Sequence, residues 1–180
     1  GLPLPFIAED LGVITPDVEA LRDHFGLPGI RLLQFAFGDD PMAHTFLPEA
    51  YQENCVAYTG THDNDTLMGW LQSTPGEGST RSCDQVAAEL GRVVKTYGPI
   101  SSDSHWRMIE ALLASRAGAV ILPLQDILGL GSEARMNIPG KADGNWDWKL
   151  KDFDQLGDAF QTLECLTRET RRSALAPIAG

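Results

Sequence analysis

The chain has 180 residues, of which 43% are hydrophobic and 22% are charged, an ordinary balance for a globular protein that excludes a disordered tail, a collagen-like repeat and a disulfide-stapled miniprotein. Its 25 acidic and 14 basic side chains give a net charge of -11, which argues against nucleic-acid partners and against binding to an anionic membrane. A neutral or cationic small molecule, or a neutral polymer, stays possible as the ligand.

Four apolar runs have the length and the β-branched or aromatic content of strands. They are residues 5–8, 30–37, 55–59 and 119–124. Acidic residues follow each run, at or shortly beyond its C-terminal end. The sequence therefore predicts four strands whose carboxyl ends carry carboxylates.

Helical patterns separate or follow these runs. Thr15 is a typical N-cap, Pro16 suits the first helical position and Gly26 is a natural stop for the first helix. The second helix is expected to bury one face, made of Val86, Leu90, Val93 and Val94. Helices are expected over residues 16–25, 84–96, about 102–117 and 154–172. Strands that alternate with helices indicate parallel βα units.

Residues 129–148 show no helical or strand period and contain four glycines, one proline and two tryptophans. A loop of this length inside a compact domain is usually functional. We interpret Trp146 and Trp148 as packing residues of this loop.

Cys55, Cys83 and Cys165 are widely spaced and form no CxxC pair, which indicates reduced thiols in a cytoplasmic protein. No apolar run reaches the roughly 18 residues that span a bilayer, and no signal peptide is recognisable. The chain begins at Gly1 without a methionine, so we expect it to be a piece of a longer protein.

Two α/β architectures fit parallel strands that end in acidic residues. One is an open doubly wound sheet, and the other is part of a (β/α)8 barrel, in which catalytic residues come from several strand ends. Acidic residues after all four strands favour the barrel, and no glycine-rich phosphate loop supports nucleotide binding. Because a whole barrel takes about 250 residues, this chain would hold about half of one.

Carboxylates at the mouth of a barrel suggest general acid and base work on a neutral substrate, with glycoside chemistry as the obvious instance. Neighbouring side chains on a regular strand point to opposite faces, so Glu9 and Asp10, or His62 and Asp63, cannot both face the mouth. Structural roles are equally open at this point: Asp10 could cap the turn that follows it, and Asp65 could cap a helix.

Several segments resemble the 4-alpha-glucanotransferases, also called amylomaltases or disproportionating enzymes. The resemblance covers nearly the whole chain in the right order, and the THDND and SEARMN strings are specific. It implies the C-terminal half of a (β/α)8 catalytic barrel of the alpha-amylase clan, in which residues 1–180 hold about the last four βα units and residues 129–148 lie on the substrate side. The segments are AEDLG (8–12), LQFAF (33–37), YTGTHDNDT (58–66), QDILGLGSEARMN (125–137) and GNWDW (144–148).

The resemblance implies a retaining transfer of part of an α-1,4-glucan to glucose or a maltooligosaccharide. Glu9 matches the general acid/base, Asp63 matches the aspartate that stabilises the transition state, and His62 matches the histidine that hydrogen-bonds the sugar. The family's nucleophilic aspartate lies upstream in an Arg-x-Asp context, and no such motif precedes Glu9. The nucleophile is therefore expected outside this chain, in a missing N-terminal half of the barrel, and the chain alone is expected to be inactive.

Further substrate contacts are expected on the same resemblance. Phe35, Asp39 and Asn137 lie where the family places sugar contacts, and Arg135 is interpreted as a structural ion-pair partner. The resemblance implies neither a cofactor nor a metal. Maltooligosaccharides or an α-1,4-glucan are the expected ligands.

Two alternatives from other classes stay open. His62, Asp63 and Asp65 are ordinary metal-ligand types, so a metal-dependent hydrolase is one. The other is a glucan-binding fragment without catalytic activity, because the nucleophile is missing from this chain.

Overall fold

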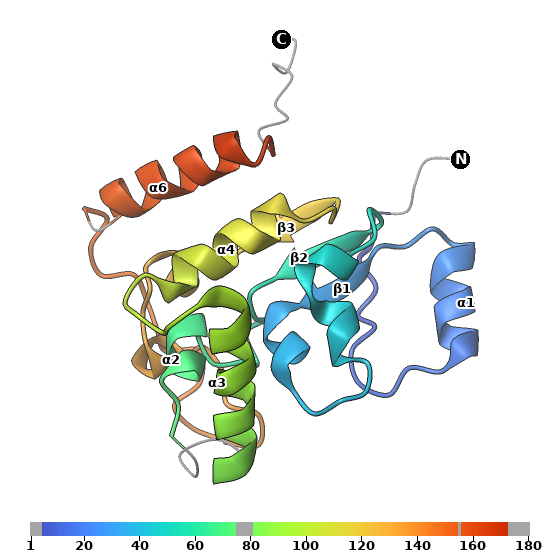
Figure 1. Cartoon of the computed structure of the whole chain (residues 1–180), viewed down its shortest axis with the longest axis horizontal. Helices are drawn as coiled ribbons and strands as arrows, with labels where there is room; N and C mark the ends of the chain where they lie inside the picture. Colours follow the sequence, from blue (N-terminus) through green and yellow to red (C-terminus); the bar gives the residue numbers. More distant parts are fainter. Residues whose placement is uncertain (1–4, 75–80, 155, 173–180) are drawn as a thin grey trace.

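The computed structural model describes residues 5–74, 81–154 and 156–172. Its centre is a parallel sheet in which the strands follow one another in chain order, β1-β2-β3 (Figure 1). Ile30 lies opposite Val56, and Ala57 lies opposite Val120. The strands are β1 (Gly29–Leu32), β2 (Cys55–Tyr58) and β3 (Ala119–Ile121).

Helices surround this sheet and lead into and out of its strands. The α-helices are α1 (Pro16–His24), α2 (Leu67–Leu71), α3 (Cys83–Tyr97), α4 (Ser104–Ala114), α5 (Leu124–Ile127) and α6 (Leu156–Glu169). Short 3-10 helices are η1 (Leu33–Phe37), η2 (Ala43–Phe46), η3 (Pro48–Ala50) and η4 (Ser132–Ala134).

The four predicted helices are confirmed as α1, α3, α4 and α6. Helix α3 begins in a capping box, in which Ser82 and Gln85 exchange side-chain and backbone hydrogen bonds. Its apolar face is narrower than predicted. Val86 and Val93 are buried, whereas Val94 is 41% exposed, so its assignment to the buried face is wrong.

The strand predictions are confirmed for β2 and corrected elsewhere. Residues 5–8 form no strand, because one backbone bond, from Ala8 N–H to the Pro28 carbonyl (2.9 Å), does not make a ladder. The run at 30–37 is strand only to Leu32 and continues as η1, whose buried positions do not alternate. The last run ends as a strand at Ile121, and α5 begins at Leu124.

The core lies between the sheet and helices α2, α3 and α4. The Phe37 ring lies 5.8 Å from the Trp70 ring and 6.0 Å from the Tyr97 ring, centroid to centroid. Met108 and Leu112 of α4 are completely buried against this group. Burial of these large apolar side chains supplies the main driving force for folding.

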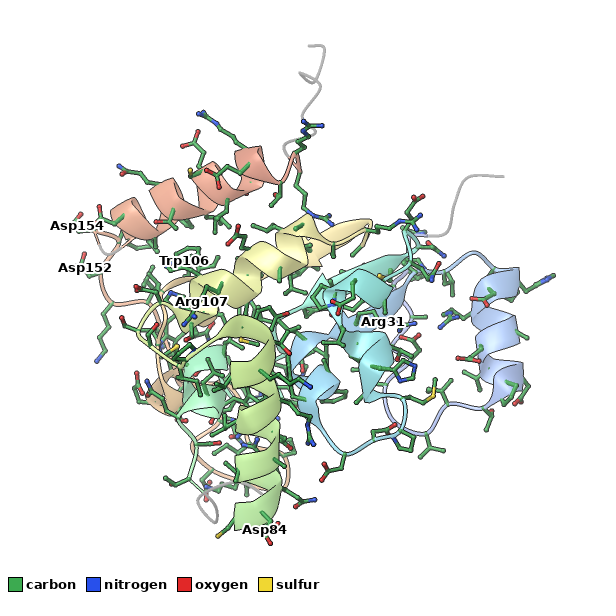
Figure 2. All side chains as sticks on the ribbon, in the orientation of Figure 1. Arg31, Asp84, Trp106, Arg107, Asp152 and Asp154 are labelled. Atoms are coloured by element: carbon green, nitrogen blue, oxygen red, sulfur yellow. The ribbon has the colours of Figure 1, made fainter. Side chains whose placement is uncertain are left out.

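Arginines fasten the helices to one another through backbone carbonyls. Arg107 on α4 donates to the carbonyls of Tyr97 and Pro99 at 2.7 and 2.6 Å, where α3 turns into α4 (Figure 2). Arg172, just after α6, donates to the carbonyl of Ala117 at 2.7 Å and to that of Leu113. Figure 1 shows the result, with α6 lying along the outer side of α4.

Asp10 connects the N-terminal segment to the sheet. Its carboxylate accepts hydrogen bonds from the Ile30 N–H (2.6 Å), Arg22 (2.5 Å) and Arg31 (3.1 Å). Burial acts to raise the pKa of Asp10, but the Ile30 N–H and the two guanidinium groups outweigh it and hold that pKa below its usual value. Asp10 therefore bridges α1 and β1 and does not cap the turn at Leu11. Helix α1 has no buried residue of its own.

Within the described ranges, no helix combines the length and the apolar character that a membrane-spanning segment needs.

Candidate active site

The predicted pair His62 and Asp63 lies in a tight turn just beyond β2. The Asn64 N–H donates to the Thr61 carbonyl (3.1 Å), and the Asn64 carboxamide oxygen accepts from the Thr61 N–H and hydroxyl, both at 2.9 Å. Because these residues form a turn, the alternation of a regular strand does not apply. His62 Nε2 lies 3.4 Å from Asp63 Oδ1, so the opposite orientations that a regular strand would impose on these two side chains do not apply.

Asp63 receives its shortest side-chain contact from the long loop, residues 129–148. Asn137 Nδ2 donates to Asp63 Oδ1 at 2.5 Å. Arg135 donates to the Asp63 carbonyl (2.7 Å) and to the Asn137 carbonyl (2.8 Å), which joins the turn to the loop. The bonds of Arg135 go to carbonyl oxygens, so its interpretation as an ion-pair partner is wrong. The structure thus brings Asn137 onto the adjacent residues His62 and Asp63, 74 positions of sequence away from Asp63.

Asp65 holds the opposite side of the turn. Its carboxylate accepts from the Ser132 hydroxyl (2.7 Å) and from the Thr66 N–H (2.8 Å). Thr66 is itself the N-cap of α2, because its hydroxyl accepts from the Gly69 N–H (3.0 Å). A Cβ at Gly69 would lie 2.5 Å from the Ser132 hydroxyl oxygen, so only glycine allows this close approach. The 3-10 helix η4, which begins at Ser132, therefore lies against α2.

Side chains that follow β1 and β3, the two neighbours of β2, also bind this turn. Gln34, just after β1, donates to the Asp65 carbonyl at 2.9 Å. Asp126, in α5 just after β3, accepts from the Leu67 N–H at 2.6 Å and from the Thr59 hydroxyl. Gln34, the turn and Asp126 all follow the carboxyl ends of their strands. The turn therefore lies at the carboxyl edge of the sheet, where ligand sites of parallel α/β folds are built.

Asp126 fastens both ends of the turn with one carboxylate. Thr59 directly follows β2 and Leu67 begins α2, so each carboxylate oxygen binds one end of the turn. Asp126 is only 1% exposed. Burial, together with the charge of Asp65, raises the pKa of Asp126 to about 6, against the lowering effect of its two hydrogen bonds. A cavity of about 130 Å³ lies at this turn, and Asp126, His62 and Arg135 are among the residues that line it.

The raised pKa of Asp126 predicts a pH-dependent stability. The folded state keeps the Asp126 proton up to about pH 6, whereas the unfolded chain loses it near 3.8. Ionisation of Asp126 is therefore less favourable in the folded state than in the unfolded chain. The free energy of unfolding should fall by about 3 kcal/mol as the pH rises from about 4 to 7. Asp126→Asn keeps an acceptor for the Leu67 N–H and cannot ionise.

Chemical denaturation of wild type and Asp126→Asn at several pH values measures this effect. The stability of the variant relative to wild type should increase with pH between about 4 and 6 and stay level above that range. A difference in unfolding free energy that does not change with pH would contradict the prediction.

The other predicted site residues, Glu9, Phe35 and Asp39, are not bonded to the His62–Asp63 pair in the described part of the chain. Glu9 is exposed on the segment before α1. The Phe35 ring is 37% exposed and meets the Phe46 ring edge-on at 5.6 Å. Asp39 pairs with Arg92 of α3 at 2.8 Å. Among the described residues, no hydrogen bond or ion pair joins these three to His62 or Asp63.

The metal alternative needs at least three donor side chains at one place. His62, Asp63 and Asp65 share one turn, but Asp65 is bound to Ser132 and to the Thr66 N–H. In the part of the chain that the structure describes, no three His, Cys, Asp or Glu side chains gather where they could hold a metal ion.

Sequence reasoning missed the residues that shape the turn. Gln34 lies in the LQFAF segment and Ser132 begins SEARMN, but neither string shows that their partners lie 31 and 67 residues away. Asp126 lies in the segment 125–137 and follows an apolar run, but neither feature indicates its bonds to Thr59 and Leu67. The one usable signal was the pairing of the THDND and SEARMN strings, since the structure joins these two strings directly.

A parallel sheet with a carboxylate, an imidazole and a carboxamide gathered at its carboxyl edge defines an α/β protein with the layout of an enzyme site. The family model for 4-alpha-glucanotransferase matches residues 2–155, and the chain belongs to this family. It is 50% identical over 160 residues to a 4-alpha-glucanotransferase of Synechocystis and 48% identical over 175 residues to one of Thermus thermophilus. These alignments cover 88% and 94% of this chain but only 29% and 33% of those proteins.

Solved structures agree with this assignment. The chain is similar to an amylomaltase from Streptococcus agalactiae in complex with acarbose, with a TM-score of 0.77 and 28% identity. That match covers 93% of this chain and 32% of the other. An amylomaltase from Corynebacterium glutamicum shares the fold at a TM-score of 0.65 and 16% identity. The chain thus spans about a third of the length of the proteins that it matches.

Proposed function

We propose that this chain provides the C-terminal half of the (β/α)8 catalytic barrel of a 4-alpha-glucanotransferase of the alpha-amylase clan. In this proposal residues 1–180 form about the last four βα units, and residues 129–148 lie on the substrate side. The family match carries the proposal, together with the His62–Asp63–Asn137 cluster at the carboxyl edge of the sheet.

The strand order supports a barrel over a doubly wound sheet. Strands β1, β2 and β3 are parallel and adjacent in chain order. A doubly wound sheet reverses its order at a switch point, whereas a barrel adds each strand on the same side. Residues 5–8, which form no strand, precede β1, and the Ala8 N–H donates to the Pro28 carbonyl.

The reaction is the transfer of a segment of an α-1,4-glucan to glucose or a maltooligosaccharide by two successive displacements. Glu9 protonates the leaving sugar oxygen and later activates the acceptor hydroxyl. The Asp63 carboxylate stabilises the cationic sugar ring. Its carboxylate is pre-oriented by Asn137 at 2.5 Å, so little rearrangement is needed as charge develops.

Sugar contacts complete the proposed site. His62 hydrogen-bonds the sugar at the point of cleavage, and Phe35, Asp39 and Asn137 contact neighbouring glucose units. Neither a cofactor nor a metal takes part. Three free cysteines, two of them exposed, support a cytoplasmic location.

The nucleophile is assigned to the other half of the barrel. Residues 1–8 contain no carboxylate side chain, and a retaining mechanism needs an aspartate or glutamate opposite the acid/base. Asp126 is a poor substitute because it is buried and both of its oxygens are occupied. The partners of this chain are then the glucan and the N-terminal half of the barrel.

Incubation with maltotriose tests the proposed function. The gene product that carries residues 1–180 should release glucose together with longer maltooligosaccharides, at a rate that EDTA does not change. The 180-residue chain on its own should give neither product. Turnover by the isolated chain would place the nucleophile within residues 1–180, and hydrolysis without longer products, or inhibition by EDTA, would contradict the transferase assignment.

A further inference from the structure

Trp146 stands out among the aromatic residues of the long loop. Its side chain is 58% exposed, so its interpretation as a packing residue of the loop is wrong. The indole ring lies 5.1 Å from the His62 imidazole, centroid to centroid, at an angle of 36°. The described part of the chain therefore leaves much of this indole uncovered directly beside the proposed cleavage site.

The backbone at Trp146 is held in a conformation that tryptophan rarely adopts. Its φ of 63° lies in the left-handed region, where the Cβ atom of a residue with a side chain crowds the backbone. Such strain persists only where the surroundings impose it, and it concentrates at functional sites. Here the Trp146 N–H donates to the Met136 carbonyl at 2.7 Å.

The side chain of Asn145 joins two further points of the loop. Its side-chain oxygen accepts from the Ile138 N–H and its amide donates to the Lys141 carbonyl, both at 2.9 Å. Residues 136–146 therefore form a closed loop whose two ends meet at Met136 and Trp146. Asn137, at one end, contacts Asp63, and Trp146, at the other, contacts His62. One rigid loop thus presents a carboxamide and an indole to the two residues of the turn.

We propose that Trp146 is a glucan-binding residue whose exposed indole face stacks on the apolar face of a glucose ring next to His62. The inference rests on the proposed function. An indole face and the C–H face of a glucose ring complement each other, because both are apolar and flat. The closed loop fixes the ring before the sugar arrives, so binding does not have to order a flexible side chain.

Two variants and one control, made in the gene product that carries residues 1–180, test this role. Trp146→Ala removes the platform, and Trp146→Phe keeps an aromatic face. Phe153→Ala is the control, because Phe153 is an exposed aromatic residue (76%) outside the site. Initial rates of glucose release across maltotriose concentrations give KM and kcat for each protein, and thermal unfolding checks that each is folded.

Trp146→Ala should raise KM about tenfold, which corresponds to about 1.4 kcal/mol, the order of one aromatic stacking contact. Its kcat should change less than about threefold. Trp146→Phe should recover most of the affinity, and Phe153→Ala should match wild type. A wild-type KM for Trp146→Ala, an equal rise in the control, or a fall in kcat at unchanged KM would overturn the proposal.

Acarbose binding gives a second readout that needs no turnover. Titration with acarbose should change the tryptophan fluorescence of the wild type, and the change should be largely lost in Trp146→Phe, which lacks the indole. An unchanged response in the variant, or none in the wild type, would overturn the role of Trp146. Absence of transfer by the wild-type gene product would instead defeat the proposed function, and the proposal for Trp146 with it.

Discussion

Asp63→Asn in the gene product that carries residues 1–180 should lower kcat for maltotriose by about two to three orders of magnitude. The substitution keeps the size of the side chain and its contact with Asn137 but removes the negative charge. Only the transition state carries the developing positive charge on the sugar ring, so KM should change much less than kcat. Steady-state kinetics of the variant measure the two constants separately.

Two further variants make this test specific. His62→Ala should cost about 1–3 kcal/mol, the value of one hydrogen bond, and so less than Asp63→Asn. Asp152→Asn removes an exposed carboxylate outside the site, before α6 (Figure 2), and should leave both constants unchanged. Equal and small losses for Asp63→Asn and His62→Ala would refute the proposed hierarchy.

Glu9→Gln should nearly abolish transfer from maltotriose, with a loss of about two to four orders of magnitude. The leaving sugar is a poor leaving group and needs a proton, which glutamine cannot supply. A glucosyl fluoride donor needs little acid assistance, so the variant should still form the covalent intermediate from it. Glucose release from maltotriose and fluoride release from the second donor measure the two cases.

Glu19→Gln is the matched control for this prediction, because Glu19 is an exposed carboxylate on the neighbouring helix α1. It should behave like wild type with both donors. Transfer from maltotriose by Glu9→Gln at close to the wild-type rate would remove Glu9 from the acid/base role. Equal losses with both donors would indicate damage to the fold and not to proton transfer.

Helices with a strong period could be predicted from the sequence, and α3 is the clearest case. Its capping residues and apolar spacing are local signals within 16 residues, from Ser82 to Tyr97. The 3-10 helix η1 could not be predicted, because Leu33–Phe37 has the composition of a strand and its course is set by packing around Phe37. The prediction of a strand at residues 5–8 was wrong for a related reason, since a strand forms only when a neighbouring strand pairs with it.

The site could be predicted as a set of residues but not as an arrangement. His62, Asp63 and Asn137 were named from their resemblance to a family, and the structure joins the last two across 74 positions of sequence. No local pattern encodes a contact of that range. Trp146 was assigned to packing, because a left-handed backbone in a loop without a period leaves no signal in the residue order.

The two hydrogen bonds that Asp126 accepts, from Thr59 and from Leu67, determine how this site could be transferred to another protein. Thr59 and Leu67 bracket the His62–Asp63 turn, and their common anchor sits on the next βα unit. A graft of residues 59–67 alone into another parallel sheet would leave the Thr59 hydroxyl and the Leu67 N–H without their acceptor. The smallest exchangeable module therefore spans two consecutive βα units, and recombination that cuts between β2 and α5 should yield chimeras with a misshapen turn unless both parents supply this carboxylate.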